Sequence, residues 1–536
     1  MKETANVSGF MVRLLAGAAT GAAVGLAFPD WALWPLLFIA YVPLLLALRG
    51  QGAWARFAIG LAAGTAMNLA ILGWVQHTLI TMSHFSPGLA AGAFFIIAAF
   101  HGIPQGLLGL IHGPLRRGAG LAWLIAVPTA HSLLESHFPR VFPFLIADGL
   151  HAELPWIQIA DVVGVRGISW MLVATSCALV ALWEFRQGPW IRLVRLGGIV
   201  LAGWLLVVGY GHWRLATIAD VPVERVLKVA LIQPHYTTDE KQLRGSRRRP
   251  MFDRSLAATE TLRERELDLV VWSEGAFPWP FPYDSEGRSL GGELSRATHH
   301  VRRLQSLVRE LDVDLFAGSL RRPGDGRRSR NSAVHLGPDG EVRGMYDKRI
   351  LVPFGEFMPL RDFFPELADS LPGVGDLDPG ERDGVFSLGD TSLAPNICYE
   401  AIHPDDVRRS AQPEVDVLVN FTNDVWFGPT KAAEQHLMLQ IWRAVELRIP
   451  MIRATNSGIS AFVTATGEVS GRTPVFEEAI LEGSVEVRRL DSFYREWGDL
   501  ILHLLAFGSG AHFVWVWRRR RLLEGDGQKG VSSALP

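Results

Sequence analysis

Long apolar runs fill the first part of the 536-residue chain, and charged residues are dense in most of the remainder. A helix needs roughly 20 mostly apolar residues to cross the ~30 Å hydrocarbon core of a bilayer. The pattern predicts about eight spans, although the second is short enough to be a re-entrant or interfacial helix. They lie at roughly 9–28, 31–48, 57–77, 88–112, 121–138, 163–183, 191–211 and 499–517.

Basic residues in the short loops indicate the orientation of these spans. Lys2 precedes the first run, Arg116 follows the fourth and Arg186 follows the sixth, whereas the loop at 78–87 has no Lys or Arg. Since basic loops stay in the cytoplasm, eight spans put both termini there and leave 212–498 on the outer face. The first run lacks a small-residue cleavage site, so we interpret it as an uncleaved helix.

Polar residues inside the predicted spans are few, namely Asn68, His101, Gln105 and His131. Ionisable groups within a membrane often mark an ion pathway, and a transporter would need a chain of them. The four residues here fit hydrogen bonds between helices instead. The pattern therefore argues against a transporter.

From residue 226 onward, short β-branched apolar runs alternate with amphipathic stretches. This alternation predicts sheets covered by helices. The predicted fold class is a membrane α-helical bundle plus an α/β domain. We expect the bundle at 1–211, the α/β domain at 224–496, a C-terminal transmembrane helix at 499–517 and a cytoplasmic tail at 518–536.

Composition narrows the class of protein. Hydrophobic residues make up 49% of the chain, and its net charge of −2 gives no reason to expect nucleic acid as a partner. The chain has 2 cysteines. Cys177 lies in an apolar run far from Cys398, so we expect no structural disulfide.

Three strands of the α/β domain end in a reactive side chain: Glu274, Lys348 (just beyond a predicted hairpin) and Cys398. Ligands of open α/β sheets collect beyond the carboxyl ends of strands. A cysteine is a nucleophile only as thiolate, so it needs a base or a cation nearby. Taken singly, an inert core thiol, a loop carboxylate and a solvated lysine are the more common interpretations of these residues. His403 leaves a papain-like pair with Cys398 open.

Several stretches carry a family resemblance. "VVWSEGAFP" (270–278), "MYDKRILVPFGEFMP" (345–359) and "NICYE" (396–400) look, in that order, like the Glu, Lys and Cys motifs of the nitrilase (carbon–nitrogen hydrolase) superfamily. With the apolar spans, and with "PWIQIADVVGVRGISW", "VNFTNDVWFG" and "RAVELRIPMIRATNSGISA", the chain resembles the apolipoprotein N-acyltransferase family over nearly its whole length. The resemblance implies an αββα sandwich carried on a membrane bundle.

The resemblance also implies roles for individual residues. The catalytic glutamate, lysine and nucleophile of the family fall on Glu274, Lys348 and Cys398. Supporting or substrate-binding roles fall on Glu356, Tyr399, Glu400 and Trp426. The family often has a tryptophan in the arm that corresponds to 235–252, and this chain has none there. Tyr236 or Phe252 are the substitutes that we expect.

The activity that this family implies is acyl transfer without a metal or cofactor. A phospholipid would acylate Cys398 as a thioester, and the α-amine of a diacylglyceryl-cysteine apolipoprotein would then take the acyl chain. The implied location is the bacterial inner membrane, with the α/β domain in the periplasm and membrane lipids as partners. Two alternatives stay open: a membrane-anchored amidase acting on a small amide, and a non-catalytic protein that binds lipids or partners.

The stretch 355–373 carries Phe357 and Phe363 soon after Lys348, with Met358, Leu360 and Phe364 beside them. It is either a surface loop packed on the core or an apolar arm that enters the membrane interface and gates lipid entry. We expect Phe357 and Phe363 to contact the lipid substrate in the second case.

Overall fold

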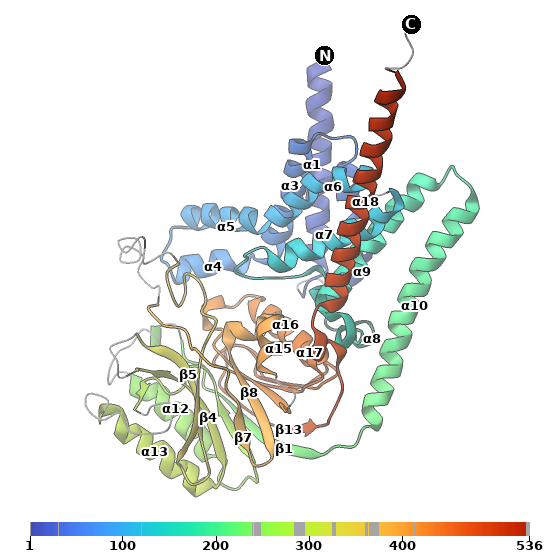
Figure 1. Ribbon diagram of the computed structural model, residues 1–536. Helices are drawn as coiled ribbons and strands as arrows, with labels where there is room; N and C mark the ends of the chain where they lie inside the picture. Colours follow the sequence, from blue (N-terminus) through green and yellow to red (C-terminus); the bar gives the residue numbers. More distant parts are fainter. Residues whose placement is uncertain are drawn as a thin grey trace.

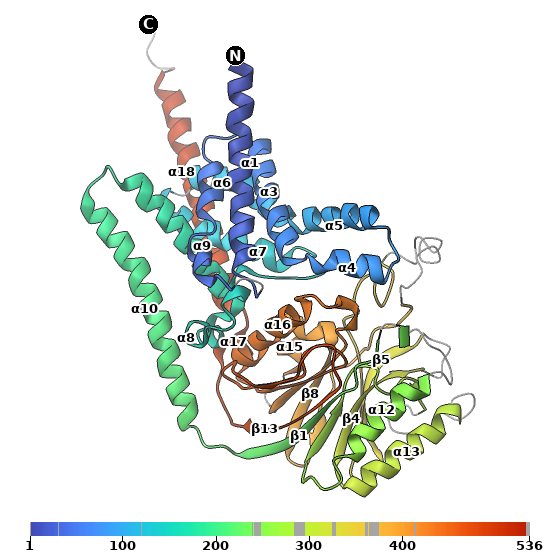
Figure 2. The same cartoon turned by 180° about the vertical axis from the view of Figure 1, so that it is seen from behind.

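The computed structural model of the chain describes residues 2–29, 32–118, 120–237, 239–240, 248–282, 295–323, 328–359, 363, 375–411 and 414–531. A helical bundle and a two-sheet domain lie end to end (Figures 1 and 2). Both termini lie at the end of the bundle that is farthest from the sheets.

The bundle is built from helices of very different lengths. Its main helices are α1 (Lys2–Leu26), α3 (Ala53–Ile71), α5 (Pro87–His101), α6 (Ile103–Gly118), α7 (Trp123–His137), α9 (Ala160–Phe185), α10 (Trp190–Asp220) and α18 (Leu500–Val531). Among the described residues, six helical segments are long and apolar enough to cross a membrane. They are Ser8–Leu26, Ala53–Ile71, Pro87–Arg116, Ala160–Phe185, Trp190–Asp220 and Leu500–Arg519.

The two other predicted spans fall on shorter elements. The run at 31–48 forms a 3-10 helix, η1 (Trp34–Phe38), and α2 (Val42–Ala47), while the run at 121–138 forms the 15-residue α7. Neither is long enough for a straight crossing. The expected membrane bundle is confirmed, with six full-length spans and two shorter apolar segments where about eight spans were expected.

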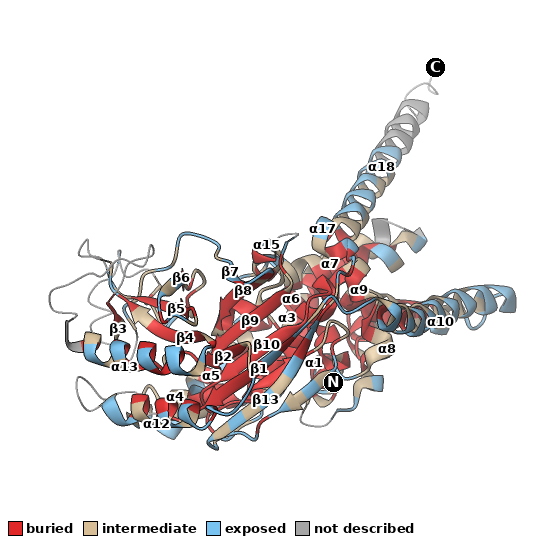
Figure 3. Cartoon of the chain, turned by 90° about the horizontal axis from the view of Figure 1, so that it is seen from below, coloured by how far each residue is buried: buried red, intermediate tan, exposed pale blue. Residues whose placement is uncertain are grey.

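Helix α10 displays apolar side chains to its surroundings. Leu201, Leu205 and Leu206 are 62%, 63% and 73% exposed, and most of the helix is pale blue in Figure 3. Soluble proteins rarely expose so continuous an apolar surface. The outward face of α10 is therefore typical of a lipid-contacting helix.

The α/β domain contains two sheets. The first has the order β13-β1-β2-β4-β5-β6, with β3 paired to β4, and the second has the order β12-β11-β10-β9-β8-β7. The strands are β1 (Arg225–Gln233), β2 (Leu269–Trp272), β3 (Pro280–Phe281), β4 (Asp314–Arg321), β5 (Arg330–Leu336), β6 (Val342–Asp347), β7 (Phe386–Leu388), β8 (Thr391–Ile397), β9 (Val417–Thr422), β10 (Met451–Thr455), β11 (Ala461–Val463), β12 (Val469–Arg472) and β13 (Ala479–Val487). Strands β1, β2 and β4 are parallel neighbours, as are β8, β9 and β10.

Apolar side chains define four layers in this domain. Phe316 of β4 and Phe421 of β9 belong to one core between the two sheets. A second core joins Trp272 to α12 (Arg249–Glu260) and α13 (Ser295–Leu311). Helices α15 (Pro404–Ser410) and α16 (Ala432–Leu447) share a core with the second sheet. The expected αββα sandwich is confirmed.

Helix α16 lies between the second sheet and the bundle (Figure 1), and all its residues except Glu434 are buried. Just past its end, the Arg448 guanidinium lies 2.9 Å from the Asp161 carboxylate of α9. The Val165 N–H of α9 donates to Glu446 at 2.8 Å. These buried contacts tie the sheet domain firmly to the helical bundle.

Candidate active site

Three strand ends deliver the reactive residues. Glu274 follows β2, Lys348 follows β6, and Cys398 begins the 3-10 helix η6 (Cys398–Ile402) after β8. Electrostatic effects of Glu274 and Lys348 both reach the Cys398 thiol. The structure therefore brings together the three residues that the sequence pattern singled out.

Asn331, on β5, connects the carboxylates of the site. Its Nδ2 donates to Glu274 Oε1 at 2.6 Å and to Glu356 Oε1 at 3.0 Å. The Asn331 carbonyl also accepts from the Lys348 N–H at 2.8 Å. One amide side chain thus sets the spacing of two carboxylates that would otherwise repel each other.

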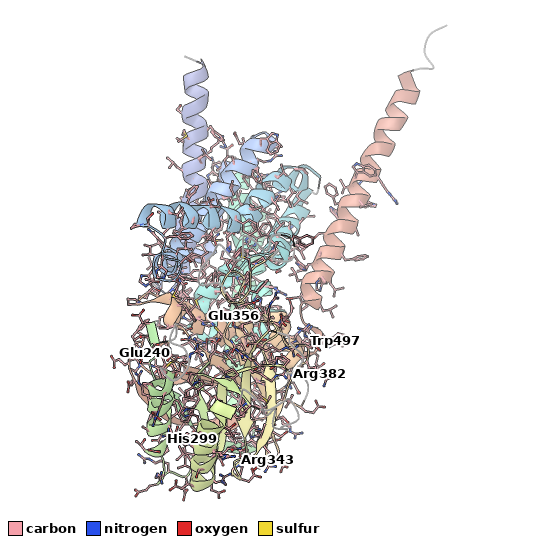
Figure 4. The ribbon with its side chains drawn as sticks, turned by 90° about the vertical axis from the view of Figure 1, so that its left-hand side faces the viewer. Glu240, His299, Arg343, Glu356, Arg382 and Trp497 are labelled. Atoms are coloured by element: carbon pink, nitrogen blue, oxygen red, sulfur yellow. The ribbon has the colours of Figure 1, made fainter. Side chains whose placement is uncertain are left out.

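Lys348 is a buried cation that is held by Glu356. Only 1% of Lys348 is exposed, and its Nζ lies 2.8 Å from Glu356 Oε2. Burial acts to lower the pKa of Lys348, but the charges of Glu356, Cys398 and Glu274 together raise it above its usual value. Lys348 is therefore protonated at neutral pH. Figure 4 shows Glu356 at the level where the sheets meet the bundle.

Cys398 adopts a backbone conformation that is uncommon for a residue with a side chain. Its φ is +52°, and non-glycine residues in this region cluster at functional sites. Burial and the Glu274 carboxylate raise the pKa of the partly buried Cys398 thiol to about 12, while Lys348 acts in the opposite direction. The resting group is a neutral thiol, so it needs a base in order to react.

Glu274 has one carboxylate oxygen available as that base. Its Oε1 accepts from Asn331, whereas Oε2 is buried without a hydrogen-bond partner in the described part of the chain. Gly318 of β4 permits this position, because a Cβ there would lie 2.5 Å from the Glu274 Cα. Only glycine lets the two backbones approach so closely.

Glu400 orients the backbone around Cys398. Its Oε2 accepts from the Ile397 N–H at 2.7 Å, and its Oε1 accepts from the Arg349 N–H at 2.7 Å and from the Tyr346 hydroxyl at 2.8 Å. The carboxylate thereby joins the end of β8 to the segment after Lys348. Glu400 supports the site and has no free oxygen for acid–base chemistry.

The side chain of Tyr399 points toward the bundle. Its hydroxyl donates to the Val141 carbonyl, and its ring packs 6.2 Å from that of Phe142. His403 packs against the same ring at 4.6 Å, and burial lowers the pKa of His403 to about 4. The carboxylate beside the Cys398 thiol is Glu274, so a papain-like pair with His403 is not formed.

Trp426, Phe357 and Phe363, for which supporting or substrate-binding roles were expected, differ in exposure. Trp426, in η7 (Val425–Phe427), is 36% exposed, and its carbonyl accepts from Thr78 of α4 (Trp74–Thr81). Phe357 is half-buried and Phe363 is 78% exposed. Leu360 and Phe364 lie outside the described residues.

The expected substitutes for the missing tryptophan are wrong. Tyr236 and Phe252 are both 0% exposed. The Tyr236 hydroxyl donates to the Met251 carbonyl at 2.8 Å, and Phe252 packs on Trp272. Both belong to the domain core, because aromatic side chains near a strand and a helix are most easily buried there.

No group of three or more His, Cys, Asp or Glu side chains suited to a metal ion occurs among the described residues. Asn331 does not stand out in the sequence, because it lies in an ordinary strand sequence, "RNSAVHL". The available signal was an amide at the start of a buried strand, where a polar side chain needs a partner.

Two sequence-family models match the chain, in agreement with this geometry. The carbon–nitrogen hydrolase family matches residues 228–495, which defines the class of the sheet domain and its site. The apolipoprotein N-acyltransferase N-terminal domain matches residues 20–178.

Full-length relatives extend the match. The chain is 31% identical to the apolipoprotein N-acyltransferase of Geobacter metallireducens over 94% of this chain and 95% of that protein. It is 27% identical to the one from Vibrio cholerae over 95% and 98% of the two chains. A carbon–nitrogen hydrolase crystal structure from Helicobacter pylori is 17% identical, covers 52% of this chain and 94% of its own, and has a TM-score of 0.38. The chain belongs to the apolipoprotein N-acyltransferase family, which acts in lipoprotein maturation, and the expected family and function are confirmed.

Replacing Asn331 with leucine should slow acyl transfer by roughly 10- to 100-fold, because misplacing a catalytic carboxylate has an effect of that size. The measurement is the initial rate of acyl transfer by the purified chain. Ser319→Ala, which removes another buried polar side chain of the same sheet, is the matched control and should stay near the parental rate. A parental rate for Asn331→Leu would show that the amide does not orient the site.

Proposed function

We propose that Cys398 receives an acyl chain from a phospholipid and passes it to the N-terminal α-amine of a diacylglyceryl-cysteine apolipoprotein. The observation that carries the proposal is the network in which Asn331 joins Glu274 to the Glu356–Lys348 ion pair beside the thiol. The network provides a base, a buried cation and a nucleophile at one place.

The first step forms the thioester. Glu274 takes the thiol proton through Oε2 as the sulfur of Cys398 attacks the ester carbonyl. A neutral thiol with a pKa of about 12 needs this transfer in order to react at neutral pH. Lys348 and the backbone N–H of Tyr399 stabilise the oxyanion, and each such donor contributes about 3–4 kcal/mol. Cleavage of the carbon–oxygen bond returns the proton from Glu274 to the departing lysophospholipid.

The second step forms an amide. The amine nitrogen of the lipoprotein attacks the thioester carbonyl, and the same two donors stabilise the second oxyanion. The carbon–sulfur bond breaks, and Glu274 moves the amine proton to the sulfur. The thiol is regenerated, so the reaction is a two-stage exchange with a covalent intermediate.

The proposed location is the bacterial inner membrane, with the sheet domain in the periplasm and both termini in the cytoplasm. The charge distribution supports it: Arg49 and Arg116 both pair with Glu184, so several basic loops lie at one end of the bundle. That end also carries the termini (Figure 1). Basic loops at one level are typical of the cytoplasmic side.

Intact-mass spectrometry of the purified chain after incubation with phosphatidylethanolamine vesicles tests the donor and the nucleophile. The parent should gain the mass of one acyl group, and Cys398→Ala should gain none. Cys177→Ala is the matched control and should be acylated like the parent, since Cys177 is buried in α9.

Addition of a diacylglyceryl peptide should then remove the adduct and yield the acylated peptide. Release of free fatty acid instead would identify a hydrolase. An unmodified parent chain would contradict the proposed donor.

Replacing Glu274 with glutamine should slow acylation of Cys398 by about 10²- to 10⁴-fold, because a general base contributes that much. The remaining rate should rise about tenfold per pH unit between about pH 6 and pH 9, since the thiolate fraction grows as pH approaches the pKa of the thiol. Removing the carboxylate lowers the pKa of Cys398, which leaves the direction of this dependence unchanged. Parental rates at neutral pH would exclude Glu274 as the base.

Replacing Phe363 with serine should slow acylation from vesicles several-fold if its exposed ring enters the membrane interface. Alkylation of Cys398 by iodoacetamide, which needs no lipid, is the internal control and should not change. Unchanged turnover on vesicles would assign Phe363 to an ordinary surface loop.

A further inference from the structure

A second polar cluster lies next to the backbone of Cys398, and Glu274 and Lys348 are not part of it. It consists of Asn420 on β9, Asp424 just after it, His436 on α16 and Arg453 on β10. Their exposed fractions are 0%, 1%, 6% and 0%. Burying a charge costs free energy unless the charge is paired and hydrogen-bonded. The contacts that stabilise this buried cluster therefore need to be identified.

The charged members of the cluster are paired with one another. Arg453 Nη2 donates to Asp424 Oδ2 at 2.7 Å, and His436 Nδ1 lies 2.8 Å from Asp424 Oδ1. Burial opposes ionisation of Asp424, but the charges of Arg453 and His436 lower its pKa below the usual value. Gly458 makes room for this carboxylate, because a Cβ there would lie 2.0 Å from Asp424 Oδ2.

Asn420 connects the cluster to the nucleophile. Arg453 Nη1 donates to Asn420 Oδ1 at 3.0 Å, and Asn420 Nδ2 donates to the carbonyls of Asn396 at 3.2 Å and Cys398 at 3.4 Å. A guanidinium can only donate and a carbonyl can only accept. The Asn420 atom that faces Arg453 must therefore be Oδ1, and the atom that faces the two carbonyls must be Nδ2.

The Cys398 carbonyl belongs to the same peptide unit as the Tyr399 N–H. A trans peptide is planar, and its C=O and N–H point in opposite directions. A hydrogen bond to the Cys398 carbonyl therefore also sets the direction of the Tyr399 N–H. This hydrogen bond matters because Cys398 has a φ of +52°, outside the conformations that a side-chain-bearing residue prefers.

We propose that Asn420, anchored by Arg453, is a positioning residue that aims the Tyr399 N–H at the oxyanion by holding the Cys398 carbonyl. Asn420 touches neither substrate nor the reacting sulfur in this role. Because the Tyr399 N–H acts only when Cys398 is acylated, the role rests on the proposed function.

The test compares two reactions of Cys398 in the purified full-length chain. Acylation by p-nitrophenyl butyrate passes through an oxyanion, whereas alkylation by iodoacetamide displaces iodide at a saturated carbon and forms none. Asn420→Ala should slow acylation by roughly 10- to 100-fold, the size of effect expected when a donor is misaimed. Alkylation should stay within about twofold of the parent, because it reports only the thiol and its base.

Two further variants keep the result interpretable. Asn420→Asp preserves the size of the side chain and its contact with Arg453, but a carboxylate cannot donate to the Cys398 carbonyl. This variant should therefore lose acylation like Asn420→Ala. It replaces the alanine variant if that variant does not fold. Gln440→Ala removes a buried amide from α16, one whose side chain has no hydrogen-bond partner among the described residues. It should keep both reactions.

Equal losses in acylation and alkylation, or no loss of acylation, would overturn the positioning role. A loss of acylation in Gln440→Ala as large as that in Asn420→Ala would overturn it as well. Vesicles of phosphatidylethanolamine form a separate arm with the parent. If p-nitrophenyl butyrate acylates the parent but the vesicles do not, the proposed donor is rejected and the role of Asn420 is still decided. If neither reagent acylates the parent, both the proposed donor and the role of Asn420 are rejected.

Discussion

The buried ion pair between Lys348 and Glu356 is the constraint on which the site depends. An ammonium group that is 1% exposed is retained only where a carboxylate compensates for the lost water. Glu356 meets this need, and it accepts in addition from the Val352 N–H at 2.9 Å and from Asn331 at 3.0 Å. The pair therefore fixes the loop after β6 as well as the charge. Through Asn331 the same constraint reaches Glu274, so one hydrogen-bond network holds both the Glu274 carboxylate and the Lys348 ammonium.

Much of this arrangement could be predicted from the sequence. The apolar runs and the alternation of strands and helices indicated both halves of the fold, because hydrophobic periodicity reflects burial directly. Glu274, Lys348 and Cys398 each follow a predicted strand, where ligands of α/β sheets gather, and the family resemblance singled them out among the other polar residues. The family resemblance also predicted a supporting role for Glu356 near Lys348.

The contacts between strands could not be predicted. Asn331 meets Glu274 across 57 positions of sequence, and Asn420 meets Cys398 across 22. Neither pairing leaves a local pattern, since the partners are neighbours only once the sheets have formed. The expectation for Tyr236 failed for a related reason: sequence shows that an aromatic residue is present but not whether the core or the solvent receives it.

The position of the site beside the helical bundle follows from the packing of the fold. Gln435 of α16 accepts from the Trp74 Nε1–H at 3.0 Å and donates to the Ile71 carbonyl at 3.0 Å. On the same side of the sheet, the residue after Cys398 donates its hydroxyl to the Val141 carbonyl. Two independent sets of hydrogen bonds thus join the nucleophile's sheet to the bundle. Because they are buried, separating the domain from the membrane part would leave polar groups unpaired, at about 1–3 kcal/mol each. The sheet cannot tilt freely away from the bundle, so Cys398 stays at the level where the sheets meet the bundle.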